Sequence, residues 1–132
     1  MNEYIKIRHI SEGKGKGAFA KKDIKKNTVI DVANVILIPN KDYKIIKKTV
    51  LYDYCYIWAD PKHKPEFENA ITLSISQFIN HSYEPNIKYL YDYKNKAIEF
   101  SAIKAIKEGE ELTVNYNGLV NDKSPVWFNV LD

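Results

Sequence analysis

The chain has 132 residues, of which 45% are hydrophobic and 28% charged. This length and balance predict one soluble globular domain with a core of its own. No segment approaches the roughly 20 apolar residues of a membrane span, so no membrane partner is expected, and the N-terminus has no apolar run of the signal-peptide type. The single cysteine, Cys55, excludes an internal disulfide and a cysteine-rich zinc site, and it predicts a cytoplasmic or other reducing intracellular compartment.

Charge is unevenly distributed along the chain, whose net charge is +3. Residues 1–50 hold 12 Lys or Arg and 5 acids, a balance of +7, whereas residues 51–132 hold 8 Lys and 12 acids, a balance of −4. An acidic second part suits a lysine-rich partner, although a lysine-rich composition spread over solvated faces is the simpler explanation. Nucleic acid is an unlikely partner, because Arg8 is the only arginine and Arg supplies the bidentate contacts to phosphates and bases.

The first third of the chain is predicted to form strands. Residues 4–10 alternate between apolar and polar side chains, and residues 18–20 can form a short strand after three glycines spaced two apart. Residues 28–38 are rich in β-branched side chains and predict one long strand or two short ones, ended by Pro39.

A short helix and further strands are predicted in the middle of the chain. Asn40 is a suitable N-cap for a helix that ends near Val50. Residues 51–58 are predicted to form a strand, because every second side chain is aromatic. Residues 71–74 suit another short strand.

The last third of the chain contains a predicted β-hairpin. Residues 87–91 and 98–102 alternate on either side of a turn, and a final strand leads into Tyr116. Many short strands with few helices predict a mainly β domain.

The glycine-rich segment Gly15-Lys16-Gly17-Ala18-Phe19-Ala20 is a candidate ligand-binding loop. Its spacing fits neither the dinucleotide fingerprint nor the P-loop. Because glycine has no Cβ, the segment allows a ligand to approach the backbone closely. An ordinary flexible turn is the alternative.

Two polar segments lie farther along the chain. Asn80-His81-Ser82 places three hydrogen-bonding side chains together before Pro85, for which a structural turn is the alternative interpretation. Residues 109–116 read Gly-Glu-Glu-Leu-Thr-Val-Asn-Tyr and end in Tyr116, for which packing at the edge of a core is the alternative.

In this order, residues 15–20, 78–86 and 109–116 resemble the motifs of the SET-domain protein-lysine methyltransferases, and they span most of the chain. The resemblance implies a β-clip SET fold, mainly β, of short strands and small sheets with few short helices and a C-terminal pseudoknot. It implies a single domain over residues 1–132, with a core at about 4–116 and a C-terminal flank at 117–132. The chain resembles the minimal stand-alone type, because it lacks the cysteine-rich segments found before and after the domain in larger members.

The resemblance also implies an activity, namely methyl transfer from S-adenosylmethionine to a lysine side-chain amine of a protein, with S-adenosylhomocysteine as product and no metal. Tyr116 corresponds to the catalytic tyrosine. Position 115 departs from the family pattern, since Asn115 replaces Asp but keeps an oxygen acceptor. The implied cofactor contacts are Lys16, Gly17, Ala18, Phe19, Asn80, His81, Tyr116 and Trp127. The implied lysine channel contains Tyr54, Tyr56 and Phe128.

Two other functions remain open at this point. One is a non-catalytic SET-fold module that binds cofactor or a peptide without turnover. The other is a small β-rich interaction protein whose motifs coincide with those of the family. The expected partner is a lysine-containing protein or peptide, and a homodimer that completes the substrate site is an open alternative.

Overall fold

The computed structural model describes residues 2–13, 15–62 and 66–126. Trp127 and Phe128, which the sequence suggested for the cofactor site and the lysine channel, lie outside the described residues. Within the described ranges, no helix has both the length and the apolar character needed to cross a membrane.

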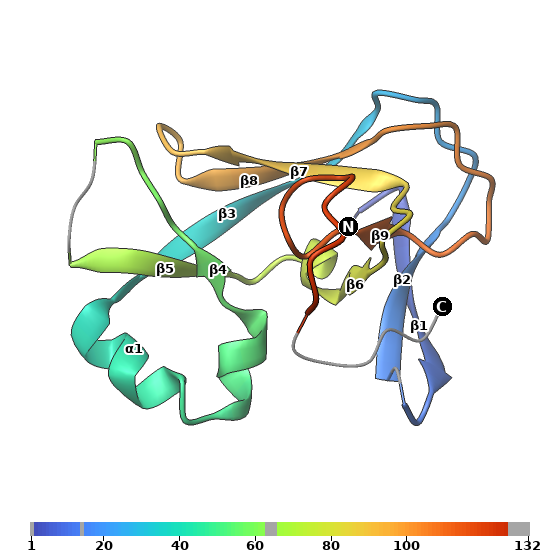
Figure 1. The fold of residues 1–132 in the computed structure, drawn as a ribbon. Helices are drawn as coiled ribbons and strands as arrows, with labels where there is room; N and C mark the ends of the chain where they lie inside the picture. Colours follow the sequence, from blue (N-terminus) through green and yellow to red (C-terminus); the bar gives the residue numbers. More distant parts are fainter. Residues whose placement is uncertain (1, 14, 63–65, 127–132) are drawn as a thin grey trace.

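The largest sheet among the described residues has five strands (Figure 1). Its central strand is β3 (Val29–Pro39), with β8 (Ala97–Ala102) and then β7 (Ile87–Asp92) on one side. On the other side lie β5 (Phe67–Thr72) and the edge strand β4 (Tyr56–Ile57). All neighbouring strands pair antiparallel. The predicted long strand and the predicted hairpin are therefore confirmed.

The sheet curls so that its two edges approach one another. β4 and β7 are opposite edges, yet the rings of Tyr56 on β4 and Tyr89 on β7 lie 5.8 Å apart in an edge-to-face contact. Such contacts between aromatic rings add about 0.5–1.5 kcal/mol to the burial of the rings. The concave side of the sheet is consequently lined with aromatic side chains.

Two smaller pairs of strands lie beside this sheet. β1 (Ile5–Ser11) and β2 (Gly15–Ala20) form an antiparallel hairpin, so the glycine-rich segment belongs to a strand. β6 (Asn80–His81) pairs in parallel with β9 (Thr113–Val114), and the pair continues with a 2.9 Å hydrogen bond from the Ser82 amide to the Val114 carbonyl. The two downstream motifs are thus joined directly, as the predicted pseudoknot requires.

A single cluster of apolar side chains packs the strands together. Phe100, Ile98, Ile87, Ile5 and Leu112 have almost no exposed surface, and burying a side chain of this size stabilises the fold by about 1.5–3 kcal/mol. Because these residues come from β1, β7, β8 and the segment before β9, the core connects the sheets and positions the motifs between them.

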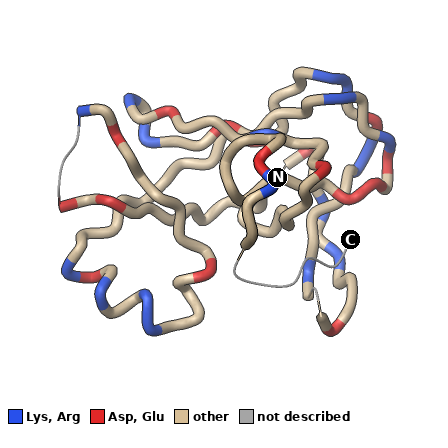
Figure 2. The backbone as a smooth tube through the Cα atoms, viewed as in Figure 1, with Lys and Arg blue, Asp and Glu red and all other residues tan. Residues whose placement is uncertain are grey.

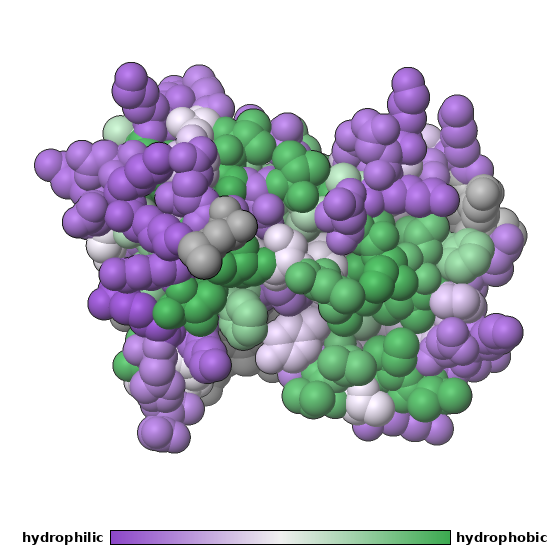
Figure 3. All heavy atoms as spheres, turned by 180° about the vertical axis from the view of Figure 1, so that it is seen from behind, coloured by the Kyte–Doolittle hydropathy of each residue, from purple (hydrophilic) through white to green (hydrophobic). Residues whose placement is uncertain are grey.

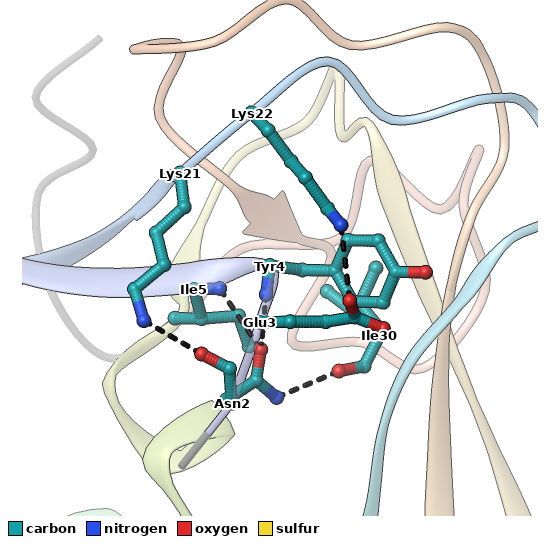
Figure 4. Close-up of polar contacts among 7 residues, drawn as sticks. All are labelled: Asn2, Glu3, Tyr4, Ile5, Lys21, Lys22 and Ile30. Atoms are coloured by element: carbon teal, nitrogen blue, oxygen red, sulfur yellow. Dashed lines mark hydrogen bonds and ion pairs between the residues drawn. The ribbon is translucent and has the colours of Figure 1, made fainter.

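The N-terminus is fixed across three strands by Asn2 (Figure 4). Its side-chain oxygen accepts hydrogen bonds from the amides of Tyr4 and Ile5, at 2.7 and 2.9 Å. Its amide nitrogen donates to the Ile30 carbonyl at 2.7 Å, and its own carbonyl accepts from Lys21 Nζ at 2.7 Å. Asn2 therefore ties the start of β1 to the end of β2 and to β3.

The helical elements differ from the prediction. The helix α1 spans Asn40–Ile46, with Pro39 rather than Asn40 at its N-cap and without a side-chain capping bond. A 3₁₀ helix, η1, spans Val50–Tyr54. A second one, η2 (Ile75–Phe78), follows β5, so the strand predicted at residues 71–74 ends at Thr72.

The strand predicted over residues 51–58 is wrong for most of its length. Thr49 Oγ1 accepts a 3.2 Å hydrogen bond from the Leu51 amide, which starts η1, and within this segment only Tyr56 and Ile57 belong to a strand. The alternating aromatics of this segment therefore do not share a strand face. Trp58 is buried in the core, where its ring contacts those of Tyr91 and Tyr93.

Candidate functional site

One large cavity, of about 1350 Å³, collects residues from all three motifs. Lys16 comes from β2, Asn80 and His81 come from β6, and Tyr116 follows β9. The parallel pairing of β6 with β9 explains how segments about thirty residues apart reach one cavity. Of the sequence-predicted residues, Lys16, Tyr54, Tyr56, Asn80, His81 and Tyr116 line it.

Tyr116 is held at both ends by residues of the second motif, residues 78–86. Its hydroxyl donates a 3.1 Å hydrogen bond to the Ile79 carbonyl. Its backbone amide donates to His81 Nδ1 at 3.0 Å. Burial, with smaller contributions from Tyr54, Tyr89 and Glu111, raises the pKa of Tyr116 to about 12. The phenol is therefore a neutral, oriented hydroxyl at physiological pH.

His81 is a buried structural partner of Tyr116. Because its Nδ1 accepts the hydrogen bond from the Tyr116 amide, that nitrogen is not available as a base. The imidazole also contacts the Tyr83 ring edge-on, at 4.5 Å between ring centroids. Tyr83 in turn donates from its hydroxyl to the Ser124 carbonyl at 2.9 Å, which links this side of the site to the C-terminal segment.

Asn80 and Gly17 form a closely packed corner of the site. Asn80 Nδ2 donates to the Lys16 carbonyl at 3.2 Å and to Glu111 Oε2 at 3.1 Å. A Cβ on Gly17 would lie 3.0 Å from Asn80 Nδ2 and 3.1 Å from Glu111 Oε2. Only glycine leaves both groups in place. In this corner the group close to the glycine segment is a side chain of the protein, and the close approach of a ligand stays a prediction.

Three of the suggested cofactor residues, Gly17, Ala18 and Phe19, are not among the residues that line the cavity. Ala18 is fully buried in the core. Phe19 lies beneath the guanidinium of Arg8, with 3.8 Å from Arg8 Cζ to the ring centroid. A contact with cofactor from any of the three residues therefore stays a prediction.

Tyrosines form the wall of the cavity beyond Tyr116. All ten tyrosines of the chain belong to its described part, and eight of them line the cavity. Burial raises the pKa values of Tyr56, Tyr89 and Tyr91 above the ordinary value for tyrosine, so these hydroxyls are uncharged hydrogen-bonding groups. The sequence indicated Tyr54 and Tyr56, but the roles of Tyr89, Tyr91 and Tyr93 were missed, because alternation in the hairpin does not reveal that the sheet curls.

Asn86 is a further residue whose role the sequence did not reveal. Its side chain is buried, donates to the Glu111 carbonyl and accepts from the Thr113 amide, both at 2.9 Å. Asn86 thus holds the strand that leads to Tyr116. The available signal was its place after Pro85 in the second motif.

The substitution at position 115 has a structural use. Asn115 Oδ1 accepts from the Asn117 amide at 3.0 Å, as the sequence comparison with Asp anticipated. Its amide nitrogen donates to the Asp122 carbonyl, which a carboxylate could not do. Asn115 therefore fixes the turn that follows Tyr116.

Among the described residues, no group of three or more His, Cys, Asp or Glu side chains is placed to hold a metal, and the metal-free site stays a prediction.

Comparison with known proteins places the domain in a family. The family model described as SET domain matches residues 15–117. A curated relative from Schizosaccharomyces pombe, a histone-lysine N-methyltransferase described as specific for H3 lysine-37, is 30% identical over 107 residues. That match covers 80% of this chain and 69% of the relative.

Solved structures share the fold of this chain. The crystal structure of the Plasmodium falciparum protein PFL0690c has a TM-score of 0.64 at 23% identity and covers 88% of this chain and 95% of its own. A chain of ctPRC2, in an autoinhibited conformation bound to S-adenosylmethionine, has a TM-score of 0.70 at 23% identity. That match covers 88% of this chain and 15% of the ctPRC2 chain.

Proposed function

This chain belongs to the SET-domain family and is a protein-lysine methyltransferase, and we propose that it uses Tyr116 to orient the lysine amine that receives the methyl group of S-adenosylmethionine. The observation that carries the proposal is the single cavity shared by Tyr116, the Asn80-His81 strand and the tyrosine wall. Its volume of about 1350 Å³ exceeds the roughly 300–1,000 Å³ of ordinary ligand pockets. It can therefore hold a cofactor and a lysine side chain together.

The proposed cofactor side is the corner formed by Lys16, Gly17 and Asn80. Asn80 uses its amide nitrogen for the Lys16 carbonyl and Glu111, which leaves its side-chain oxygen as an acceptor for a ligand ammonium. Lys16 lines the same cavity, and its ammonium can attract a ligand carboxylate. When bound there, S-adenosylmethionine supplies a methyl group on a positively charged sulfur. The full proposed set is Lys16, Gly17, Ala18, Phe19, Asn80, His81, Tyr116 and Trp127.

The proposed lysine side of the cavity is the tyrosine wall. Tyr54, Tyr56 and Tyr89 line it, and their rings can cover the lysine stem and attract its ammonium before the proton is lost. Exclusion of water by the rings then favours the neutral amine, because burial disfavours the charged form of a lysine. Phe128 completes this proposed set.

Tyr116 acts by orientation in this proposal. Its hydroxyl proton is directed to the Ile79 carbonyl, so the phenolic oxygen can accept a hydrogen bond from the lysine amine. The pKa of about 12 means that the phenol does not serve as a base near neutral pH. Fixing the amine in line with the reacting carbon can by itself supply much of the rate acceleration.

A Tyr116→Phe variant tests this role. We expect methyl transfer from labelled S-adenosylmethionine to a panel of lysine proteins, including histone H3, to fall by about 10²-fold or more. Calorimetric affinity for S-adenosylhomocysteine should stay within about twofold, because the backbone bond to His81 is kept. Tyr83→Phe is the matched control, since its hydroxyl faces the Ser124 carbonyl. Undiminished turnover in Tyr116→Phe would contradict the assigned role.

The substrate is proposed to be a protein lysine, and the single cysteine supports a reducing intracellular compartment. The non-catalytic alternative is disfavoured by Tyr116, which is present and fixed beside the aromatic wall. A homodimer that completes the substrate site stays a prediction.

A further inference from the structure

The segment that borders the tyrosine wall exposes an unusual surface. Tyr43 on α1 and Tyr52 on η1 line the cavity, with their ring centroids 6.5 Å apart. Neither α1 nor η1 contributes a buried residue to the protein. The two elements therefore border the cavity, although neither has a residue buried in the core.

Apolar side chains on this segment face solvent. Ile45, Val50 and Leu51 are 68%, 71% and 45% exposed. In the view from behind, hydrophobic side chains gather over the region of α1 (Figure 3, lower right). Scattered exposed apolar residues are ordinary, but a group of them beside a binding cavity marks a surface that meets a partner.

The same segment is basic. Lys41, Lys44, Lys47 and Lys48 are all exposed, and with Asp42 and Asp53 they give residues 40–54 a charge of 4 − 2 = +2. Figure 2 shows blue segments following one another along α1 and the turn after it. Within the described part of the chain, the ion pair found is Lys22 with Glu3, so none of the four has its charge neutralised there. These four lysines with Ile45, Val50 and Leu51 are termed the α1–η1 surface.

We propose that the α1–η1 surface docks an acidic, apolar-bearing segment of the protein substrate that flanks the target lysine. Opposite charges on that segment would be attracted to the lysines and would exclude wrongly charged partners. Apolar side chains on it would cover Ile45, Val50 and Leu51. The proposal rests on the proposed function, because it places the bound lysine in the adjoining cavity.

The mixed character of the surface decides among possible partners. A nucleic-acid backbone offers phosphates for the lysines but no apolar complement for Ile45 or Val50. A strongly basic segment would meet four like charges as it entered the cavity beside α1. An acidic protein segment with apolar side chains matches both features, so the substrate context differs from that of a purely basic tail.

Peptide binding tests the proposal without requiring turnover. Two fluorescein-labelled peptides of equal length carry one central lysine, flanked by Glu and Leu in one and by Arg and Gly in the other. With S-adenosylhomocysteine present, we expect fluorescence anisotropy to show at least about tenfold tighter binding of the acidic peptide. The variant K44E/K47E/K48E should reverse the order of the two peptides.

A variant of equal charge change is the control. K25E/K26E/K104E alters exposed lysines that do not line the cavity and should keep the preference for the acidic peptide. Tighter binding of the basic peptide by the unmodified chain, the same response in both triple variants, or no binding of either peptide would overturn the proposal. So would a labelled DNA duplex that binds through Lys44, Lys47 and Lys48 more tightly than the acidic peptide.

Failure of the proposed function gives a different pattern. The peptide preference would then persist while the chain neither bound S-adenosylhomocysteine nor transferred a methyl group. Conversely, methyl transfer that is equal for both peptides, with intact cofactor binding, would remove the docking proposal and leave the enzyme assignment in place.

Discussion

At the scale of single residues, Tyr116 depends on neighbours that come from another motif. The Ile79 carbonyl accepts a hydrogen bond from the Tyr116 hydroxyl, and His81 Nδ1 accepts one from the Tyr116 amide. Burial keeps the phenol neutral by raising its pKa to about 12. The orientation of the hydroxyl is therefore built into the protein before substrate arrives, which is the arrangement expected of electrostatic and positional catalysis.

The Gly17 corner gives a prediction at this scale. In Gly17→Ala, the new Cβ would lie 2.5 Å from Ile10 Cδ1 and 3.0 Å from Asn80 Nδ2. Ile10 can turn away, but Asn80 must move from its bonds to Lys16 and Glu111. We expect affinity for S-adenosylhomocysteine to fall by about tenfold, equivalent to about 1.4 kcal/mol, in a calorimetric titration.

Gly109→Ala controls for general destabilisation. Gly109 has a φ of 89° with nothing near its missing Cβ, so alanine there strains the backbone away from the cavity. It should lower stability and leave cofactor affinity unchanged. If both variants bound S-adenosylhomocysteine like the unmodified chain, Gly17 would have no role in placing Asn80.

At the scale of elements, the short parallel pair β6–β9 determines where the site forms. A pair with two partnered residues on each strand offers few ladder bonds, and Asn86 adds two more from its side chain. The buried amide behaves as an additional rung between the second and third motifs. The position of Tyr116 therefore depends on a residue five positions beyond His81.

Asn86→Ala tests this dependence. The substitution removes the two buried hydrogen bonds that Asn86 makes with the Glu111 carbonyl and the Thr113 amide, and losing one side of a buried hydrogen bond costs about 1–3 kcal/mol. We expect the free energy of unfolding in urea to fall by about 2–4 kcal/mol. Asn95→Ala, which removes one exposed side-chain hydrogen bond to Asp92, should change it by less than about 0.5 kcal/mol. Equal losses in the two variants would contradict the role of Asn86.

The elements also show what sequence can and cannot predict here. Richness in β-branched side chains indicated β3 correctly, and regular alternation indicated the β7–β8 hairpin. Alternation failed over residues 51–58, where aromatic spacing resembles a strand but Thr49 caps a 3₁₀ turn. Local hydrogen bonding by one hydroxyl overrode the pattern.

At the scale of the whole molecule, the motifs predicted which residues meet, but the shape of the site could not be predicted. Lys16, Asn80, His81 and Tyr116 were indicated by their motifs and do line one cavity. The participation of Tyr89 and Tyr91 results from the curl that brings β7 toward β4. Curl depends on non-local packing, which no single segment encodes.

The tyrosine wall predicts how the stability of the whole protein depends on pH. Burial raises the pKa of Tyr116 from 10.0 to about 12, and it also raises the pKa values of Tyr56, Tyr89 and Tyr91. A raised pKa means that the folded protein holds the proton more tightly than the unfolded chain. This contribution is complete below pH 10 and is lost as the pH rises toward 12.

Urea midpoints at pH 8, 10 and 11 measure the effect. We expect the midpoint to fall above pH 10, and to fall less steeply in Tyr116→Phe, which lacks one of the titrating groups. The difference between the two urea midpoints at pH 8 measures the stability that is lost when the hydroxyl itself is removed. An equal slope in the two proteins would show that Tyr116 is not shielded from solvent in the folded state.

Calorimetric titration of the purified chain with S-adenosylhomocysteine tests the central claim most directly, because it requires no knowledge of the substrate. The cavity predicts binding of one ligand per chain, weakened by about tenfold or more in Asn80→Ala, whose missing amide groups belong to the proposed cofactor corner. Absence of binding at millimolar ligand, or equal binding by Asn80→Ala, would contradict a cofactor site formed by Lys16, Gly17 and Asn80.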